Sequence, residues 1–302
     1  MGVEWYREQV RARGSQLEPH DEDLDYGDRR LHHGWMRQET DGKYCYGAYL
    51  ETGRVIDGGA NGQLRSMVKR LTESYPSVLL YVTPNQDLLF AGIEEAEKGR
   101  FEAQMKSFGY GTRGGKPFTT LRLLSGACVG RDTCRLTYTD SEKFEPYLLD
   151  DLDEKWGHMA ESIGITGCER QCFRPATKTI GWMGTGFNLY ALKLGGTEDG
   201  RHQGGYLVDP KTLQIHMRLV PRKEVPKVTS ALFEFYVSKG SQEELSKPGQ
   251  MGYFFRRVGI EAIIEYLKNN PDTAQLMKKT TPNPLVSDPF YSNQSLLRDF
   301  KA

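Results

Sequence analysis

The hydrophobic pattern of the first 124 residues alternates between the two-residue period of strands and the longer period of helices. Two alternating runs on either side of a turn at Asp41 and Gly42 predict a pair of strands, and apolar residues at helical spacing predict a helix over 61–75. Two further strands over 77–93 and a second helix over 93–110 follow. This order predicts an antiparallel sheet covered by helices on one face, an α+β half-domain.

The rest of the chain, residues 125–302, has the pattern of a separate α/β domain. Helices are predicted over 141–159, 223–240 and 261–270, and strands over 162–168 and 177–196, where two strands flank a glycine turn. A parallel β–α–β arrangement is expected, with sites at the strand ends, where open α/β sheets place them. The tail 281–302 is polar and rich in proline, which predicts irregular structure. The predicted fold class is α+β, with domains over 1–124 and 125–302.

Composition and charge restrict the kind of partner. The chain has 302 residues, 38% of them hydrophobic, with 40 basic and 40 acidic residues. This balance gives no reason to expect nucleic acid or a membrane surface as a partner, and no run approaches the roughly eighteen apolar residues of a membrane span. Residues 3–13 have the pattern of an amphipathic helix rather than of a signal peptide. We therefore predict a soluble protein of the reducing cytoplasm.

Four of the five cysteines lie close together in the sequence. Cys128 and Cys134 form a C-x5-C pair, and Cys168 and Cys172 form a C-x3-C pair. An iron–sulfur cluster needs four thiolates that converge on one site, which two short loops can supply. Close spacing within each loop also limits how much chain must be ordered to build the site.

Three alternatives to a cluster remain open at the level of spacing. A structural zinc site prefers C-x2-C or C-x4-C pairs, and neither is present. Disulfides are compatible with the cysteine count, although nothing in the sequence indicates an oxidising compartment. The cysteines could also be isolated buried residues that act as small hydrophobes. Cys45 lies in an alternating strand far from the other four, and this last interpretation suits it best.

The sequence around the four cysteines resembles the sirohaem-containing sulfite and nitrite reductases. The matching stretches are GACVGRDTC, SIGITGCERQCFRPATKTIGWMG and FNLYALKLGG, and the resemblance extends to Leu267. It implies a 4Fe–4S cluster held by Cys128, Cys134, Cys168 and Cys172, with Cys172 also bridging to the iron of sirohaem. It further implies that the first domain is one of two ferredoxin-like repeats that together clasp the tetrapyrrole.

The resemblance also indicates which residues of the first domain approach sirohaem. The stretch TPNQDL breaks a strand pattern with a proline, which exposes backbone groups. It is either a plain turn or, by resemblance, a sirohaem contact through Asn85 and Gln86. Arg113 lies in a glycine-rich passage before the cysteines, where it is either part of a solvated linker or a cation for the carboxylates of sirohaem.

Four arginines lie in or beside the cysteine loops and are further candidates for charge around the site. Arg131 lies in the first loop, Arg135 directly follows Cys134, Arg170 lies in the second loop, and Arg174 lies two residues after Cys172, where the resembled family commonly has arginine. Each taken singly could be an ordinary surface cation. Together they place positive charge where it would lower thiol pKa values, raise the reduction potential of a cluster and pair with carboxylates.

Two departures from the family limit the comparison. The second loop reads Cys-Glu-Arg-Gln-Cys, where the family often has Cys-Pro-Asn-Gly-Cys, so Glu169, Arg170 and Gln171 change the stiffness and polarity of the loop. Assimilatory members are also about twice as long, with two related halves, and most of their anion-binding residues come from the half that this chain lacks. The chain could be a fragment, one subunit of a split enzyme, or a single-repeat protein that completes its pocket by self-association.

The resemblance implies an oxidoreductase that reduces sulfite to sulfide or nitrite to ammonia with six electrons, sulfite being slightly favoured. Its expected partners are the small anion and an electron donor, either ferredoxin or a flavoprotein reductase. A subunit equivalent to the absent N-terminal half is a further candidate partner. The alternative is a non-catalytic cluster-binding or sirohaem-binding subunit that needs a partner for turnover.

Overall fold

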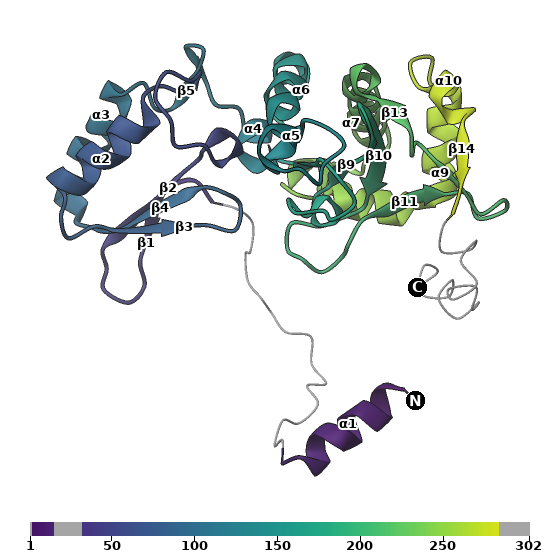
Figure 1. The fold of residues 1–302 in the computed structure, drawn as a ribbon, viewed down its shortest axis with the longest axis horizontal. Coiled ribbons are helices and arrows are strands. Elements are labelled where there is room, and N and C mark those ends of the chain that lie inside the picture. Colours follow the sequence, from purple (N-terminus) through teal and green to yellow (C-terminus); the bar gives the residue numbers. More distant parts are fainter. Residues whose placement is uncertain (1, 15–31, 284–302) are drawn as a thin grey trace.

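The computed structural model describes residues 2–14 and 32–283. Apart from helix α1 (Val3–Ala12), which confirms the helix predicted at the N-terminus, these residues form two lobes side by side (Figure 1). Each lobe has its own hydrophobic core, one reaching Phe118 and the other beginning at Leu121. We call residues 32–118 the first lobe and residues 119–283 the second lobe. The irregular tail predicted over 281–302 is wrong at its start, because Thr280–Pro282 form a strand that pairs with Gln214–His216, and residues 284–302 lie outside the described residues.

The first lobe is an antiparallel sheet covered by two helices. Its strands are β1 (Gly34–Arg37), β2 (Tyr44–Ala48), β3 (Leu79–Val82) and β4 (Leu88–Ile93), in the spatial order β1-β2-β4-β3, and its main helices are α2 (Leu64–Ser74) and α3 (Lys98–Ser107). All neighbouring strands pair antiparallel, as the sequence predicted. Figure 1 shows both helices on the same face of the sheet.

The helices pack on the sheet because their apolar residues recur on one side. Leu64, Met67 and Leu71 of α2 are buried, as are Phe101 and Met105 of α3. Burial of apolar surface stabilises this packing by about 25 cal/mol for each Å² removed from water. Short elements also belong to the lobe: η1 (Glu51–Gly53), η2 (Glu95–Glu97), β5 (Thr112–Arg113) and β6 (Lys116–Pro117).

The second lobe is built on a larger sheet of mixed direction. In the described part of the chain its strands run in the order β14-β12-β11-β10-β9-β8-β7, and β13 pairs with β10. The strand bounds are β7 (Gly126–Ala127), β8 (Ile163–Thr166), β9 (Ile180–Gly186), β10 (Leu189–Leu194), β11 (Gly205–Val208), β12 (Gln214–His216), β13 (Val220–Pro221) and β14 (Thr280–Pro282).

The expectation of a parallel β–α–β arrangement is correct only for one part of this sheet. β7, β8 and β9 pair parallel, with α6 (Ser141–Trp156) between the first two, whereas the other strand pairs are antiparallel. The reason is the length of the connections, because a short turn can join only antiparallel neighbours, whereas parallel strands need a crossover. The turn between β9 and β10 is of the short kind.

Helices of the second lobe cover this sheet. They are α4 (Thr120–Leu124), α5 (Gly130–Thr133), α6, α7 (Val225–Lys239), α8 (Gln242–Ser246), α9 (Met251–Asn269) and α10 (Ala274–Met277), with short turns η3 (Pro175–Thr177) and η4 (Arg222–Glu224). The helix predicted over 261–270 is the second part of α9, which is kinked at Gly259 (φ 80°). Trp182 of β9 is fully buried and donates its indole N–H to the Thr229 hydroxyl of α7 at 3.1 Å.

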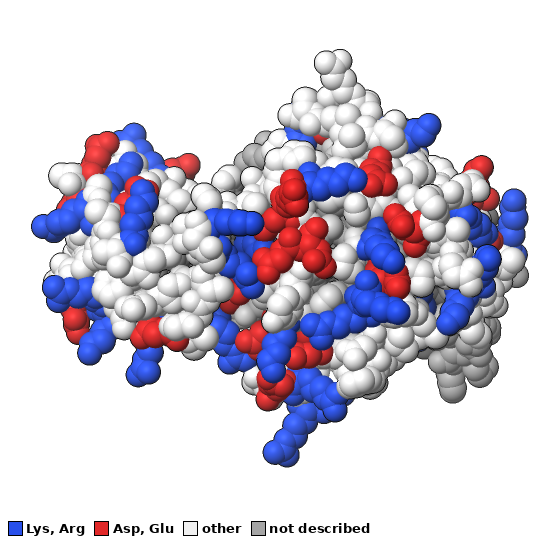
Figure 2. Space-filling view, turned by 90° about the horizontal axis from the view of Figure 1, so that it is seen from above, with Lys and Arg blue, Asp and Glu red and all other residues white. Residues whose placement is uncertain are grey.

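Charge is mixed over the surface, and no membrane-spanning element is present in the described part. Figure 2 shows acidic and basic side chains interspersed over one face of both lobes. This agrees with the equal numbers of acidic and basic residues in the chain. None of the described helices combines the length and the apolarity needed to cross a membrane.

Candidate metal centre

The parallel strands β7 and β8 bring the two cysteine pairs together. Cys128 follows β7 directly, and Cys168 follows β8 after one residue. The strands are paired in parallel with Ala127 opposite Ile165, so their carboxyl ends lie at the same edge of the sheet. Such an edge is where open α/β sheets place their sites. The sequence prediction of cysteine loops at strand ends is therefore correct for one cysteine of each pair.

The four sulfurs lie in one region. Burial raises the pKa of the Cys172 thiol, and the nearby Cys128, Cys168 and Cys134 raise it further. Like charges exert such an effect only across short distances, so all four thiols are neighbours. Every cysteine is a free thiol, which removes the disulfide alternative for the described structure.

Three polar groups surround the sulfur of Cys128. The Gly167 backbone N–H donates to its sulfur at 3.2 Å, and the Thr166 hydroxyl lies 3.7 Å from it. The Ser141 hydroxyl lies 3.0 Å from the same sulfur and donates to the Cys128 carbonyl at 3.0 Å. Ser141 is the first residue of α6, so this helix fixes the first loop (Cys128–Cys134).

The second loop (Cys168–Cys172) is a tight turn near the surface. Gln171 donates its N–H to the Cys168 carbonyl at 3.2 Å and has a φ of 55°, in the left-handed region. Glycine adopts this region freely, whereas other residues do so at a cost of about 1 kcal/mol. The resembled family often has glycine here, so Gln171 keeps the turn and accepts the strain. The loop ends at Cys172, which is exposed.

An aromatic contact ties the two loops together. Phe173 follows Cys172 and is buried, and its ring covers Gly126 in β7, two residues before Cys128. A side-chain carbon at Gly126 would fall 2.4 Å from the Phe173 ring, closer than any packed structure allows. Glycine is therefore required at position 126 for the loops to meet.

Two predicted sirohaem contacts from different lobes touch each other. Arg174 donates to the Asn85 side-chain oxygen at 2.7 Å and to the Pro84 carbonyl at 3.0 Å. Asn85 and Gln86 lie in the turn between β3 and β4, and Gln86 has a φ of 71°. Because Arg174 lies two residues after Cys172, this contact places the turn of the first lobe beside the second loop. The grouping of Asn85, Gln86 and Arg174 beside the second loop agrees with their predicted role, which itself stays a prediction.

The other predicted cations differ in their surroundings. Arg131 is exposed and lies over the Phe187 ring, 5.2 Å from its centre. Arg170 is exposed within the second loop. Neither the ring contact nor the exposure assigns either residue to a cofactor. Cys45 is half-buried in β2, with its sulfur 3.6 Å from the Met36 carbonyl, as its strand position predicted.

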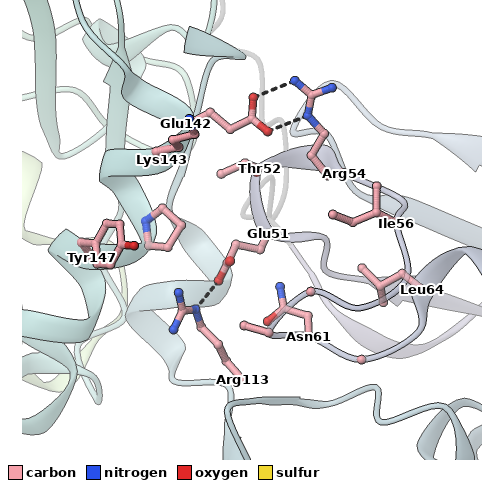
Figure 3. Close-up of a pocket in the computed structure, with 14 residues that line it drawn as sticks. Glu51, Thr52, Arg54, Ile56, Asn61, Leu64, Arg113, Glu142, Lys143 and Tyr147 are labelled. Atoms are coloured by element: carbon pink, nitrogen blue, oxygen red, sulfur yellow. Dashed lines mark hydrogen bonds and ion pairs between the residues drawn. The ribbon is translucent and has the colours of Figure 1, made fainter. Parts of the chain in front are cut away.

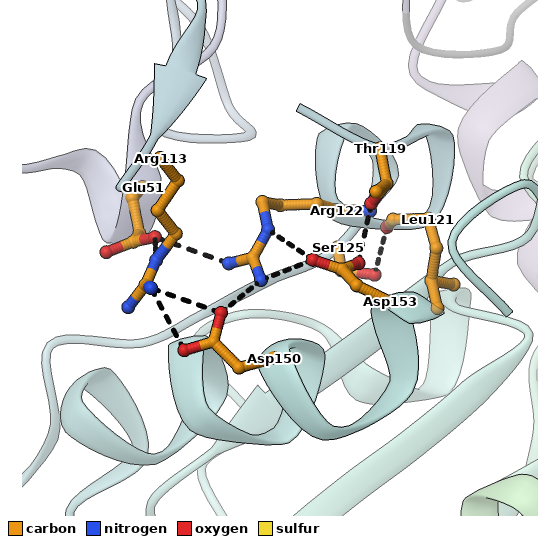
Figure 4. Close-up of polar contacts among 8 residues, drawn as sticks. All are labelled: Glu51, Arg113, Thr119, Leu121, Arg122, Ser125, Asp150 and Asp153. Atoms are coloured by element: carbon orange, nitrogen blue, oxygen red, sulfur yellow. Dashed lines mark hydrogen bonds and ion pairs between the residues drawn. The ribbon is translucent and has the colours of Figure 1, made fainter. Parts of the chain in front are cut away.

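Arg113 lies away from the cysteine loops, in a network of charges between the lobes (Figure 4). It donates to Glu51 at 2.5 Å and to Asp150 at 2.9 Å. Arg122 is 2% exposed and donates to Asp150 and Asp153, each at 2.7 Å. The Arg113 guanidinium is therefore occupied by carboxylates of the chain. The solvated-linker interpretation is wrong, because a tight network joins the lobes at this point.

Next to this network lies a pocket of about 250 Å³ between the lobes (Figure 3). Arg54 closes one side by donating to both oxygens of Glu142, at 2.5 and 2.7 Å, and to the Thr133 hydroxyl at 2.7 Å. Thr133 directly precedes Cys134, so the pocket lies beside the first loop. Sequence reasoning missed this pocket, because its residues come from both lobes and share no spacing pattern.

A buried carboxyl group lies in the same region. Glu145 is fully buried, and neither of its oxygens has a hydrogen-bond partner among the described residues. Burial raises the pKa of Glu145 to about 8, and the nearby Glu51 adds to the effect. Burial also raises the pKa of Tyr49, and the adjacent Glu145 raises it further. At neutral pH Glu145 is therefore largely protonated.

The spacing of the thiols bears on the choice between a cluster and a single metal ion. Within residues 2–14 and 32–283, no three His, Cys, Asp or Glu side chains are close enough together to hold one ion. A zinc ion lies about 2.3 Å from each of its sulfurs, which draws them tightly together. In a 4Fe–4S cluster each thiolate binds a different iron, so the sulfurs lie farther apart. The four thiols are neighbours, but within the described residues they are not gathered as tightly as one zinc ion requires.

Curated relatives of this chain are sulfite reductase haemoproteins. No family model matches the chain. It is 30% identical over 267 residues to the NADPH sulfite reductase hemoprotein beta-component of Staphylococcus carnosus, covering 86% of this chain and 43% of the relative. The protein of that name from Shewanella woodyi is 29% identical, with 89% and 44% covered. The chain spans less than half the length of these relatives.

Solved structures show the same fold. The NirA protein of Mycobacterium tuberculosis has a TM-score of 0.58 at 17% identity, over 87% of this chain and 47% of that one. Dissimilatory sulfite reductase I has a TM-score of 0.51 at 12% identity, over 84% and 80%. The resemblance first indicated by the cysteine stretches is confirmed. The chain is a homologue of the sulfite reductase haemoprotein components, within the sulfite and nitrite reductase family.

Proposed function

We propose that this chain is the cluster-bearing and sirohaem-bearing part of an oxidoreductase that reduces sulfite to sulfide, or nitrite to ammonia. The observation that carries the proposal is the convergence of four free thiols at the ends of β7 and β8. The homology to haemoproteins of sulfite reduction supports it. Sulfite is preferred because the curated relatives carry that name.

Different residues of the chain would hold the two cofactors. Cys128, Cys134, Cys168 and Cys172 would hold the 4Fe–4S cluster, and exposed Cys172 would also face sirohaem. The two groups supply one-electron transfer and an iron at which a small anion can be reduced. The ferredoxin-like character of the first lobe is part of the same proposal, since it would place the turn between β3 and β4 over the tetrapyrrole.

The chain itself contributes charge and rigidity. Arg174 would face carboxylates of sirohaem while its hydrogen bonds to Asn85 and Pro84 hold the lobes in register. Asn85, Gln86, Arg131 and Arg170 would complete the polar rim on this side. Fixed cations near the site would also raise the local concentration of a small anion. Arg113 would act at a distance, by fixing the lobes, because its donors are engaged by Glu51 and Asp150.

Electrons would come from outside the chain. The relatives are named as a beta-component of an NADPH enzyme, so a flavoprotein reductase is the first candidate donor and ferredoxin the second. A subunit equivalent to the unmatched half of the relatives, or a second copy of this chain, is a further candidate partner. Free thiols suit the reducing cytoplasm, which we propose as the location.

A second candidate function is a cluster-carrying subunit without turnover of its own. The observation that favours it is that the Arg113 guanidinium, a predicted cation for sirohaem, is engaged by Glu51 and Asp150 instead. A chain of this kind would bind the cluster but hold sirohaem weakly. The two functions therefore differ in haem content and in activity of the isolated chain.

The test is to purify the full chain without oxygen and to measure its absorption, iron and acid-labile sulfide. A complete centre gives sirohaem bands with about five irons per chain, four from the cluster and one from the haem, and reduces sulfite with a chemical electron donor. Cluster absorption without haem and without turnover supports the second function. An iron-free protein after reconstitution under reducing conditions would overturn both.

A further inference from the structure

One turn of the first lobe contacts the first cysteine loop directly. η1 ends at Gly53, and Arg54, which follows it, donates to both oxygens of Glu142 and to the Thr133 hydroxyl, over 2.5 to 2.7 Å (Figure 3). The first lobe supplies none of the four cysteines of the candidate site. Its contact with the first loop therefore serves something other than ligation. We call residues 51–54 the coupling turn.

The two partners of this guanidinium lie beside the two cysteines of the first loop. Thr133 directly precedes Cys134. Glu142 directly follows Ser141, whose hydroxyl lies 3.0 Å from the Cys128 sulfur. A guanidinium that binds a carboxylate through two parallel hydrogen bonds is fixed in orientation as well as in position. One side chain of the first lobe therefore sets the distance between the residues next to both cysteines.

The Cys134 end of the first loop has little support of its own. Cys134 follows α5, a helix of only four residues, and its N–H donates to the Gly130 carbonyl at 2.9 Å. A single helical turn is unstable alone, because its few hydrogen bonds do not offset the cost of ordering the first residues. Thr133 is exposed and Cys134 is half-buried, whereas Cys128 is buried. Packing therefore restrains this end of the loop less than it restrains the other.

The coupling turn itself is strained and held from outside. Thr52 has a φ of 54° and Gly53 a φ of 75°, both in the left-handed region. Thr52 is branched at its β-carbon and buried, and such a residue keeps this conformation only where its surroundings impose it. A side-chain carbon at Gly53 would fall 2.8 Å from Cβ of Gln86, and the Leu50 N–H donates to Asp87 at 2.9 Å. The coupling turn is therefore fixed against the turn between β3 and β4.

The same packing connects the coupling turn to the second loop. The turn between β3 and β4 contains Pro84 and Asn85, which accept hydrogen bonds from Arg174, two residues after Cys172. The coupling turn therefore contacts the first loop directly and the second loop through one intervening turn. A displacement of the first lobe would alter both contacts together.

We propose that Arg54 is a positioning residue for the four-cysteine site, which it acts on from the opposite lobe by fixing Cys134 relative to Cys128. It does so through Thr133 and Glu142, on a turn that also supports the second loop. The first lobe thereby becomes part of the support of the cluster although it supplies no ligand. The step from thiol positions to a cluster rests on the proposed function.

The first test needs no metal. The full chain is prepared free of iron under reducing conditions, and the rate at which iodoacetamide alkylates each cysteine is followed by mass spectrometry. In Arg54→Met, Cys134 is expected to react about tenfold faster, because hydrogen bonds to a charged group that hold the loop are lost, while Cys45 keeps its wild-type rate. Arg70→Met, an exposed arginine on α2 of the same lobe, is the matched control and should change no rate.

Two further variants separate positioning from a general loss of stability. Arg54→Lys should restore part of the protection of Cys134, because an ammonium can bind Glu142 but cannot span both partners. Thr133→Val removes only the hydroxyl of an exposed residue and keeps the pair of Arg54 and Glu142. It should speed the alkylation of Cys134 less than Arg54→Met does. Equal rates at Cys134 in Arg54→Met and Arg70→Met would overturn the proposal, as would an equal increase at all five cysteines in Arg54→Met.

The second test concerns the cluster. Wild-type, Arg54→Met and Arg70→Met chains are reconstituted with iron and sulfide without oxygen, and iron release to a chelator and the EPR spectrum of the reduced cluster are compared. Arg54→Met is expected to release iron about tenfold faster and to alter the spectrum, whereas Arg70→Met should match the wild type. Identical release and spectra in all three would overturn the role at the cluster. A wild-type chain that takes up no iron, yet protects Cys134 through Arg54, would overturn the proposed function and keep the hold of Arg54 on the loop.

Discussion

The two cysteine loops serve one candidate site from opposite surroundings. In the first loop, Cys128 is buried; its sulfur accepts from the Gly167 N–H and the Thr166 hydroxyl and lies in contact with the Ser141 hydroxyl. In the second loop, Cys172 is exposed and follows a residue with strained, left-handed backbone. The first loop belongs to the core of the second lobe, and the second loop faces outward toward the first lobe.

The different burial of Cys128 and Cys172 suits the two loops to different roles. A buried, hydrogen-bonded thiol fixes where a cluster is held, because its neighbours allow it one position. An exposed thiol at the end of a tight turn remains accessible to a further group, which suits the bridging position proposed for Cys172. A change in the first loop should therefore affect folding and iron together, and a change in the second loop should affect the haem chemistry first.

The largest expected effect is that of Cys128→Ala. Removal of the sulfur leaves the buried Gly167 N–H without its acceptor, which costs on the order of 1–3 kcal/mol, and deletes a cluster ligand. We expect iron and acid-labile sulfide to be lost and the free energy of unfolding to fall. Denaturant unfolding and iron analysis check this. A variant with full iron content would show that the first loop does not hold the cluster.

Cys172→Ser is expected to abolish six-electron reduction while leaving the fold intact. The side chain is exposed, so the substitution leaves no cavity or buried unsatisfied group. Turnover with a chemical donor and circular dichroism measure the two properties separately. If this variant kept its sulfite reduction, the bridging role would have to move to another residue.

Glu145→Gln should change how stability depends on pH. Burial raises the pKa of Glu145 to about 8 in the folded chain, against about 4.3 in the unfolded chain. Between these values the folded state keeps a proton that the unfolded state releases. Stability therefore falls by about 1.4 kcal/mol per pH unit as pH rises through this window. The variant should lack that slope, as measured by denaturant unfolding at pH 5 and pH 8; equal slopes would exclude the shift.

Arg174→Met is expected to lower sirohaem content and to keep the cluster. The guanidinium would lose both its bonds to the turn at Asn85 and its charge for haem carboxylates. Arg170→Met, in the same exposed region but without the contact to that turn, is the matched control and should lose less. The ratio of haem absorption to acid-labile sulfide measures the effect. An unchanged ratio in Arg174→Met would remove this residue from the proposed pocket.

Cys45→Ser is expected to have the smallest effect. Cys45 lies in β2 of the first lobe, and its sulfur contacts the Met36 carbonyl rather than the cysteine loops. Iron and sulfide content should equal those of the wild-type chain. Loss of iron here would show that the fifth cysteine had been assigned to the wrong role.

The sequence by itself determined the local elements and the cysteine pairs. Alternation and helical spacing located the main strands and helices of the first lobe and, in the second lobe, β8, β9, β10, α6, α7 and the second part of α9, because these patterns follow from which side of an element is buried. The short strands β11 to β14 were not predicted. The stretches around Cys128 and Cys168 identified the family, and the comparisons confirm it. Spacing alone did not separate cluster from zinc, since both begin from paired cysteines.

Only the tertiary structure decided what lies between the lobes. The contact of Arg174 with Asn85 joins residues 89 positions apart, and the Arg54 contact with Glu142 spans 88. The mixed direction of the larger sheet likewise depends on which strands become neighbours. No local pattern encodes such pairings, because they arise when distant segments pack together and bury their apolar faces.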